Sequence, residues 1–209
     1  MTASPEQAIY RLRKTRRADP PKRYRRTLEL SDEATGQMLA TCDVMGQVAF
    51  ATHRIVDHEQ QVWQVAPNRR IMPSRWLLTD PAQQVIVQFS QQILRKILNP
   101  LRRTGLTLLD AAGNETARLL DSRTGIFHRL LGPGEDDWIL ARGGAPIARL
   151  VRLPTPEPAG DGLLKRIGRL LTQSDRGLVS LGPDHVLPAP AALALFMLVE
   201  ELTNPSAVE

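Results

Sequence analysis

The chain has 209 residues, of which 42% are hydrophobic, and this composition supports a globular protein with one sizeable domain or two small ones. Its net charge of +5 at pH 7 is concentrated near the N-terminus. A single cysteine, Cys42, excludes an internal disulfide, and the N-terminal residues lack the apolar stretch of a secretory signal, so we expect a cytoplasmic protein.

Residues 1–27 carry a charge of +7, which leaves −2 for the rest of the chain. Nine basic residues stand there against Glu6 and Asp19, namely Arg11, Arg13, Lys14, Arg16, Arg17, Lys22, Arg23, Arg25 and Arg26. Such a composition predicts a disordered basic arm that lacks the apolar residues needed for packing. The arm either keeps the protein soluble or attaches it to an anionic partner such as acidic lipid, nucleic acid or an acidic protein.

Four stretches of the middle chain share one pattern, in which an apolar run leads to a polar residue, a tight turn and a second run. The polar residues are Asp43, Asp80, Asp110 and Arg142. Aspartate accepts hydrogen bonds from the amides of a type I turn, and glycine suits the end of that turn, so each stretch is predicted to be a β-hairpin. The four stretches are 39–51, 76–89, 106–120 and 138–151.

Further short strands are predicted at 27–31, 61–67, 125–131 and 177–181, which brings the total to about twelve. Two other segments have apolar residues at helical spacing. Residues 91–103 are predicted to form a short crossover helix, and residues 162–173 an amphipathic surface helix.

Residues 189–202 are predicted to form a helix that begins after two prolines and is apolar on every side. The apolar run is shorter than the roughly 20 residues that span a bilayer. The helix must therefore be enclosed by protein. An eight-stranded barrel is filled by its own side chains, so about twelve strands are needed to hold a helix about 10 Å wide. We therefore predict a mainly β protein, an antiparallel closed barrel around this helix, followed by a tail at 204–209.

The order of the hairpins, with "LLTDPAQQVIVQF", "LTLLDAAGNETARLL" and "WILARGGAPIARLV" followed by an apolar C-terminal helix, resembles the superfamily of tubby C-terminal domains, phospholipid scramblases and plant LURP-one-related proteins. The resemblance covers about residues 28–203 and implies one domain, a closed barrel of twelve antiparallel strands around a helix. It also implies phosphoinositide binding through Lys and Arg on the barrel, as in tubby domains. Calcium-driven lipid scrambling is not expected, because Asp110–Glu115 is too short for a calcium loop.

The sequence offers little that points to catalysis or to a metal site. His53 and His58 lie five residues apart, a spacing that separates them on a strand and on a helix, so a metal site there is not expected. Cys42 has no histidine at the spacing of a nucleophile pair and is expected to be buried. We therefore expect no enzyme, no cofactor and no metal.

The best candidates for a binding site are basic residues in two places, between the predicted strands 61–67 and 76–89 and in the segment 91–103. They are Arg69, Arg70, Arg75, Arg95, Lys96, Arg102 and Arg103. Arginine pairs bidentately with phosphate oxygens, so these residues either form an anionic head-group site or are dispersed over the surface. The resulting hypothesis is a non-enzymatic module that binds anionic phospholipid or a membrane surface as a peripheral protein. The alternative is a scaffold whose basic arm contacts an acidic protein or nucleic acid.

Overall fold

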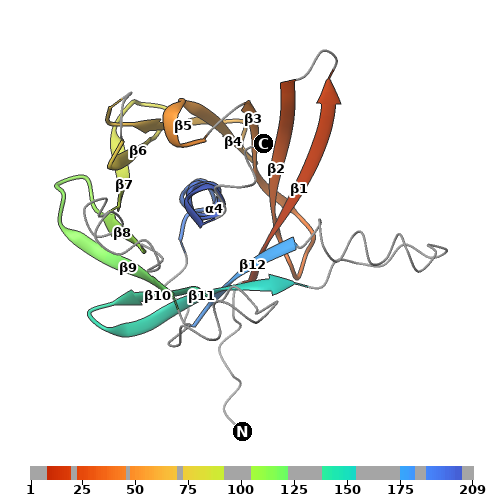
Figure 1. The fold of residues 1–209 in the computed structure, drawn as a ribbon. Coiled ribbons are helices and arrows are strands. Elements are labelled where there is room, and N and C mark those ends of the chain that lie inside the picture. The colour runs from red at the N-terminus through yellow and green to blue at the C-terminus, as the bar shows by residue number, and fades with distance from the viewer. Residues whose placement is uncertain are drawn as a thin grey trace, which may run out of the picture.

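The computed structural model describes residues 9–19, 23–45, 48–69, 73–91, 105–121, 138–153, 175–181 and 187–203. Twelve antiparallel strands follow one another in chain order around a closed barrel, and β1 closes it by pairing with β12 (Figure 1). The strands are β1 (Ile9–Asp19), β2 (Arg23–Asp32), β3 (Met38–Met45), β4 (His53–Asp57), β5 (Val62–Pro67), β6 (Arg75–Thr79), β7 (Val85–Gln91), β8 (Leu106–Leu109), β9 (Glu115–Asp121), β10 (Trp138–Arg142), β11 (Ala145–Leu153) and β12 (Asp175–Ser180). A 3-10 helix, η1 (Val48–Phe50), follows β3, and the helix α4 (Ala189–Thr203) lies in the centre.

The helix α4 is the core of the barrel, which confirms the predicted architecture. Every residue from Ala191 to Val199 has at most 2% of its surface exposed. The barrel wall contributes Trp76, Phe89 and Trp138, each at most 1% exposed. Because strand residues alternate between the two faces of a sheet, each strand can present apolar side chains to the helix and polar ones to solvent. An enclosed helix has no solvent side, which explains why this one is apolar all round.

The chain enters the barrel just before α4. The hydroxyl of Tyr10 on β1 donates a hydrogen bond to the carbonyl oxygen of Leu187 at 3.0 Å. The amide of Ala192 donates to the carbonyl oxygen of Pro188, which starts the helix. These contacts place the N-terminal end of α4 beside the beginning of β1.

Three hairpins share one loop design, in which an aspartate is followed four positions later by glutamine or asparagine. The aspartate Oδ1 accepts a hydrogen bond from the backbone amide of that later residue at 2.9, 2.8 and 2.8 Å, in the pairs Asp57–Gln61, Asp80–Gln84 and Asp110–Asn114. In each loop, the residue directly before that glutamine or asparagine has a positive φ. These residues are Gln60, Gln83 and Gly113. The pairing register shifts at the end of β6 and of β8, as expected for a type I turn followed by a bulge.

The turns predicted at Asp80, Asp110 and Arg142 are confirmed, and the turn predicted at Asp43 is wrong. Asp43 lies inside β3, where its carboxylate accepts a hydrogen bond from the hydroxyl of Thr27 on β2 at 2.7 Å. It therefore holds two neighbouring strands together instead of capping a turn. The strands predicted at 27–31, 61–67 and 177–181 correspond to parts of β2, β5 and β12.

The predicted disordered arm is also wrong for most of its length, because Ile9–Asp19 and Arg23–Asp32 form the first two strands. Tyr10 and Leu12 pack against the core, while Arg11 and Arg13 alternate with them. Apolar and basic residues do alternate in this part of the sequence, as in a strand, but the large number of basic residues hides the pattern. Residues 1–8 and 20–22 lie outside the described residues.

Other predictions fall partly or wholly outside the part of the chain that the structure describes. Gln91, the first residue of the predicted crossover helix, is the last residue of β7, and residues 92–104 are not described. The same holds for the strand at 125–131, the helix at 162–173 and the tail at 204–209.

Candidate functional site

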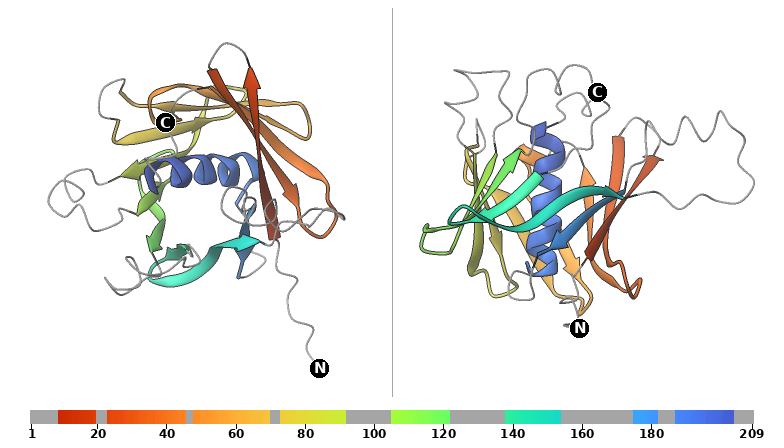
Figure 2. Two further views of the ribbon diagram at one scale, coloured as in Figure 1. Left: turned by 45° about the vertical axis from the view of Figure 1, so that its right-hand side comes forward. Right: turned by 90° about the horizontal axis from the view of Figure 1, so that it is seen from below.

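The barrel has two ends that differ in their connections. Odd-numbered strands run from one end to the other and even-numbered strands run back, because all neighbours are antiparallel. The tight hairpins 33–37, 58–61, 80–84, 110–114 and 143–144 lie at the end where α4 begins, which we call the turn end. The odd-numbered strands end, and the even-numbered strands begin, at the other end, where α4 terminates, which we call the loop end (Figure 2, right). The connections that join strands there are 20–22, 46–52, 68–74, 92–105, 122–137 and 154–174.

The connections that join strands at the two ends differ in their charge in the sequence. The loop-end connections contain twelve basic residues: Lys22, Arg69, Arg70, Arg95, Lys96, Arg102, Arg103, Arg123, Arg129, Lys165, Arg166 and Arg169. They contain five acidic residues: Glu135, Asp136, Asp137, Glu157 and Asp161. The turn-end connections, together with residues 181–188, contain no Lys or Arg and five acidic residues: Glu33, Glu59, Asp80, Asp110 and Asp184. The loop-end connections thus carry +7 and the turn-end connections −5.

The hairpin of β1 and β2 adds further positive charge at the loop end. The register of the two strands pairs Arg16 with Arg26 and Arg17 with Arg25. The register therefore places four arginines in the half of the hairpin nearest the loop end.

The other residues of the predicted arm belong to this same hairpin. Arg11 donates to Glu33 through both Nε and Nη2, the latter to Oε1 at 2.6 Å. Arg13 is exposed, and Arg23 starts β2. Lys22 lies outside the described residues.

The structure describes two of the seven predicted site residues. Arg69 and Arg75 are both exposed and flank the connection between β5 and β6 at the loop end. The backbone of Asn68 and Arg75 closes this connection with a 2.8 Å hydrogen bond. The remaining five, Arg70, Arg95, Lys96, Arg102 and Arg103, lie outside the described residues. In the sequence, Arg70 belongs to the connection between β5 and β6, and the other four belong to the connection between β7 and β8.

A cluster of charged side chains lies beside the C-terminal part of α4, and the sequence did not predict it. Glu200 of α4 accepts a hydrogen bond from Lys14 Nζ at 3.0 Å, and its other oxygen lies 3.8 Å from Arg176 Nε on β12. The exposed fractions of these side chains are 18% for Glu200, 22% for Lys14 and 7% for Arg176. A signal was available, since Glu200 is the first charged residue after nine buried apolar ones.

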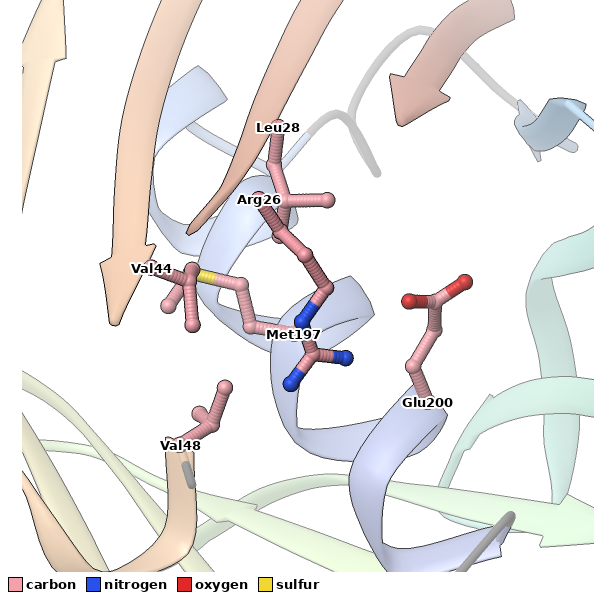
Figure 3. A pocket seen from close by; sticks show the side chains of 6 residues that line it. All are labelled: Arg26, Leu28, Val44, Val48, Met197 and Glu200. Atoms are coloured by element: carbon pink, nitrogen blue, oxygen red, sulfur yellow. The ribbon is translucent and has the colours of Figure 1, made fainter. Parts of the chain in front are cut away.

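A small pocket lies beside this cluster. Its lining comes from β2, β3, η1 and α4, and consists of Arg26, Leu28, Val44, Val48, Met197 and Glu200. Figure 3 shows the Arg26 side chain extending along Met197, so that its guanidinium lies between Val48 and Glu200. Its enclosed volume is about 10 Å³, which is room for about one water molecule. The pocket thus combines an apolar wall with a cation.

The histidines and the cysteine do not form a metal or nucleophile site in the described part of the chain. His53 is buried on β4, whereas His58 is exposed in the following turn. Burial raises the pKa of the Cys42 thiol to about 12, so this cysteine stays protonated. Among the described residues, no group of three His, Cys, Asp or Glu side chains is placed to hold a metal ion. His128 and His185 lie outside them.

In the described part of the chain, no helix is both long enough and apolar enough to cross a bilayer. Comparison of the chain with models of protein families, with curated proteins and with solved structures finds no match.

Proposed function

We propose that the protein is a non-enzymatic binding module that attaches to an anionic phospholipid surface through the loop end of its barrel. The observation that carries this proposal is the segregation of charge, +7 on the loop-end connections against −5 on the turn-end connections. A protein with one positive and one negative end is attracted to a negative surface and turns its positive end toward that surface. The resemblance to tubby and scramblase domains points in the same direction.

One exposed aromatic side chain at the loop end supports a membrane as the anionic partner. Phe50 is 51% exposed and follows β3 at this end, where it can enter the head-group layer. Trp76, Phe89 and Trp138 are buried in the barrel and cannot stack on bases. Binding of single-stranded nucleic acid usually needs such exposed aromatic platforms.

The test compares two pairs of substitutions that remove the same charge from exposed positions. Arg69→Gln with Arg75→Gln acts at the loop end, and Arg118→Gln with Arg142→Gln acts near the turn end. Deletion of residues 1–27 is unsuitable because it would remove β1 and part of β2 from the barrel.

The measurement is co-sedimentation with vesicles of phosphatidylcholine, with or without phosphatidylserine. We expect wild type to bind only the anionic vesicles. The loop-end pair should weaken binding by about thirtyfold, since each basic residue near an acidic surface contributes about 1 kcal/mol. The turn-end pair should leave binding within about threefold of wild type.

Two outcomes would overturn the proposal. One is that wild type does not sediment with anionic vesicles at low salt. The other is that duplex DNA binds more tightly than the vesicles and displaces the protein from them, which would assign the basic end to nucleic acid.

A further inference from the structure

The first strand of the barrel is longer than its pairing with the strand that closes the barrel. β12 pairs with β1 only from Ile9 to Leu12, whereas β1 continues to Asp19. On its other side, β1 stays paired with β2 up to the pair Asp19–Arg23. In the described part of the chain, no strand pairs with residues 13–19 on the side where β12 lies. The distal part of the β1–β2 hairpin therefore projects from the barrel with one open edge (Figure 1).

The backbone groups of every second residue on this edge point away from β2. The carbonyl oxygen of Ile9 accepts a hydrogen bond from the amide of Glu33, directly after β2. Successive residues of a strand direct their N–H and C=O groups alternately to its two sides, so the odd-numbered residues of β1 face β2. The even-numbered residues beyond the pairing with β12 are Lys14, Arg16 and Ala18. Their amides and carbonyls therefore face the open edge.

Basic residues dominate the sequence of this edge. An open strand edge can accept an extended segment of another chain as an additional strand. Like charges at opposite positions of a strand pair destabilise it, so a second copy of this basic strand is a poor partner. Charge complementarity favours a segment with acidic side chains. Residues 13–19 contain Arg13, Lys14, Arg16 and Arg17 against Asp19.

We propose that the open edge of β1 is a docking site for an extended acidic segment of a partner protein, which adds a strand beside residues 13–19. Main-chain hydrogen bonds to residues 14, 16 and 18 supply the affinity, and the charges of the two strands supply the specificity. This site goes beyond membrane attachment, because attachment to an anionic surface depends on charge and needs no strand edge.

Proline substitutions test the backbone contribution. The amide of Arg16 faces the open edge, so Arg16→Pro removes no hydrogen bond within the barrel, and proline is tolerated on an edge strand in this position. Arg16→Gln is the matched control, because it removes the same charge and keeps the amide. Ala18→Pro removes another edge amide without any change of charge.

The measurement is the fluorescence anisotropy of a labelled synthetic peptide of alternating glutamate and valine, at low salt, with each full-length protein. We expect wild type to bind and Arg16→Gln to bind about threefold more weakly, through loss of one cross-strand charge pair. Arg16→Pro should bind about tenfold more weakly than Arg16→Gln, and Ala18→Pro about tenfold more weakly than wild type. Each proline leaves a peptide carbonyl without its donor. The same peptide with N-methylated amides should bind none of the proteins.

The melting temperature of each variant shows whether it folds. If Arg16→Pro does not fold, Ala18→Pro decides the matter. Loss of folding in both proline variants would show that these amides are bonded within the barrel, and would overturn the open edge.

Three further outcomes would overturn the proposal. One is equal peptide binding by Arg16→Pro and Arg16→Gln, which would assign the binding to charge alone. Another is equal binding of a peptide with lysine in place of glutamate. The third is self-association of wild type that Arg16→Pro abolishes, which would assign the edge to a second copy of the chain. Binding to anionic vesicles should be the same for Arg16→Pro and Arg16→Gln, since both lack the same charge, so vesicle sedimentation tests membrane attachment separately.

Discussion

At the scale of single residues, the aspartates of the hairpins explain why the sequence could be divided into strands at all. Asp80 and Asp110 were found because each follows an apolar run and starts a polar loop. Asp57 also closes a turn, by accepting a hydrogen bond from the backbone amide of Gln61, four positions later. Its other carboxylate oxygen accepts a hydrogen bond from Trp63 Nε1 at 2.8 Å. The sequence did not predict this turn, because the histidines around Asp57 resemble a possible metal site and draw attention from the turn pattern. The spacing Asp-x-x-x-Gln/Asn, which all three hairpins share, predicts these turns better than the apolar runs do.

The hairpin of β8 and β9 allows a test of this design through pH. Hydrogen bonds from Asn114, from both its side chain and its backbone, lower the pKa of Asp110 below its ordinary value of 3.8. The ionised carboxylate therefore stabilises the fold fully above about pH 4, and this contribution is lost as pH falls through the lower, folded pKa. We expect Asp110→Asn to melt below wild type at pH 7 and the two to converge in acid.

The measurement is circular dichroism melting of both proteins between pH 7 and the lowest pH at which they fold. A difference in melting temperature that stays constant over this range would contradict the assignment.

Two glycines of the same region should differ in their tolerance of alanine. A Cβ at Gly105 would lie 1.9 Å from the carbonyl oxygen of Leu119 on β9, so the backbone would have to shift. A Cβ at Gly113 meets nothing within 4 Å, but the φ of +90° strains an alanine by about 1–2 kcal/mol. Urea unfolding should show Gly105→Ala to be the more destabilised. Equal or greater stability of Gly105→Ala would contradict the close approach of the two backbones.

At the scale of elements, the sequence predicted α4 to within one residue, because an apolar run of that length between prolines and glutamates has few alternatives. It did not predict β1 or the first residues of β2 as strands, because charge counted over 27 residues hides the alternation that Tyr10 and Leu12 carry. It also gave no view of the Glu200 cluster. Its members are distant in the sequence, and only closure of the barrel brings them together.

The enclosure of α4 predicts how core substitutions behave. Phe196→Ala should cost about 3–5 kcal/mol through loss of packing, measured by urea unfolding. Leu195→Asp should prevent soluble folding, because it buries an unpaired charge. Leu120→Asp makes the same change at a position that is 44% exposed and should be tolerated. A folded Leu195→Asp variant with a normal melting temperature would show that α4 is not enclosed.

At the scale of the whole molecule, the segregated charge predicts a fixed orientation on a membrane. The chain is suited to site-specific labelling, because its only native thiol is buried and has a pKa of about 12. Cysteines introduced at Thr52, at the loop end, and at Ala82, at the turn end, are both exposed. A solvent-sensitive fluorophore should brighten and shift to the blue on anionic vesicles only at Thr52.

Pure phosphatidylcholine vesicles serve as the control and should change neither label. A response at Ala82 equal to that at Thr52 would mean that the protein has no preferred face toward the bilayer.

The pairing of Ile9–Leu12 with Arg176–Val179 also governs the order in which the protein can fold. Each local hairpin can form as soon as its residues exist, but this pairing joins segments more than 160 residues apart, and loop closure over that distance is slow. The helix that fills the barrel is made after every strand. A growing chain therefore holds its apolar wall residues without their helical partner until α4 has been made, and until then those residues can aggregate instead of assembling.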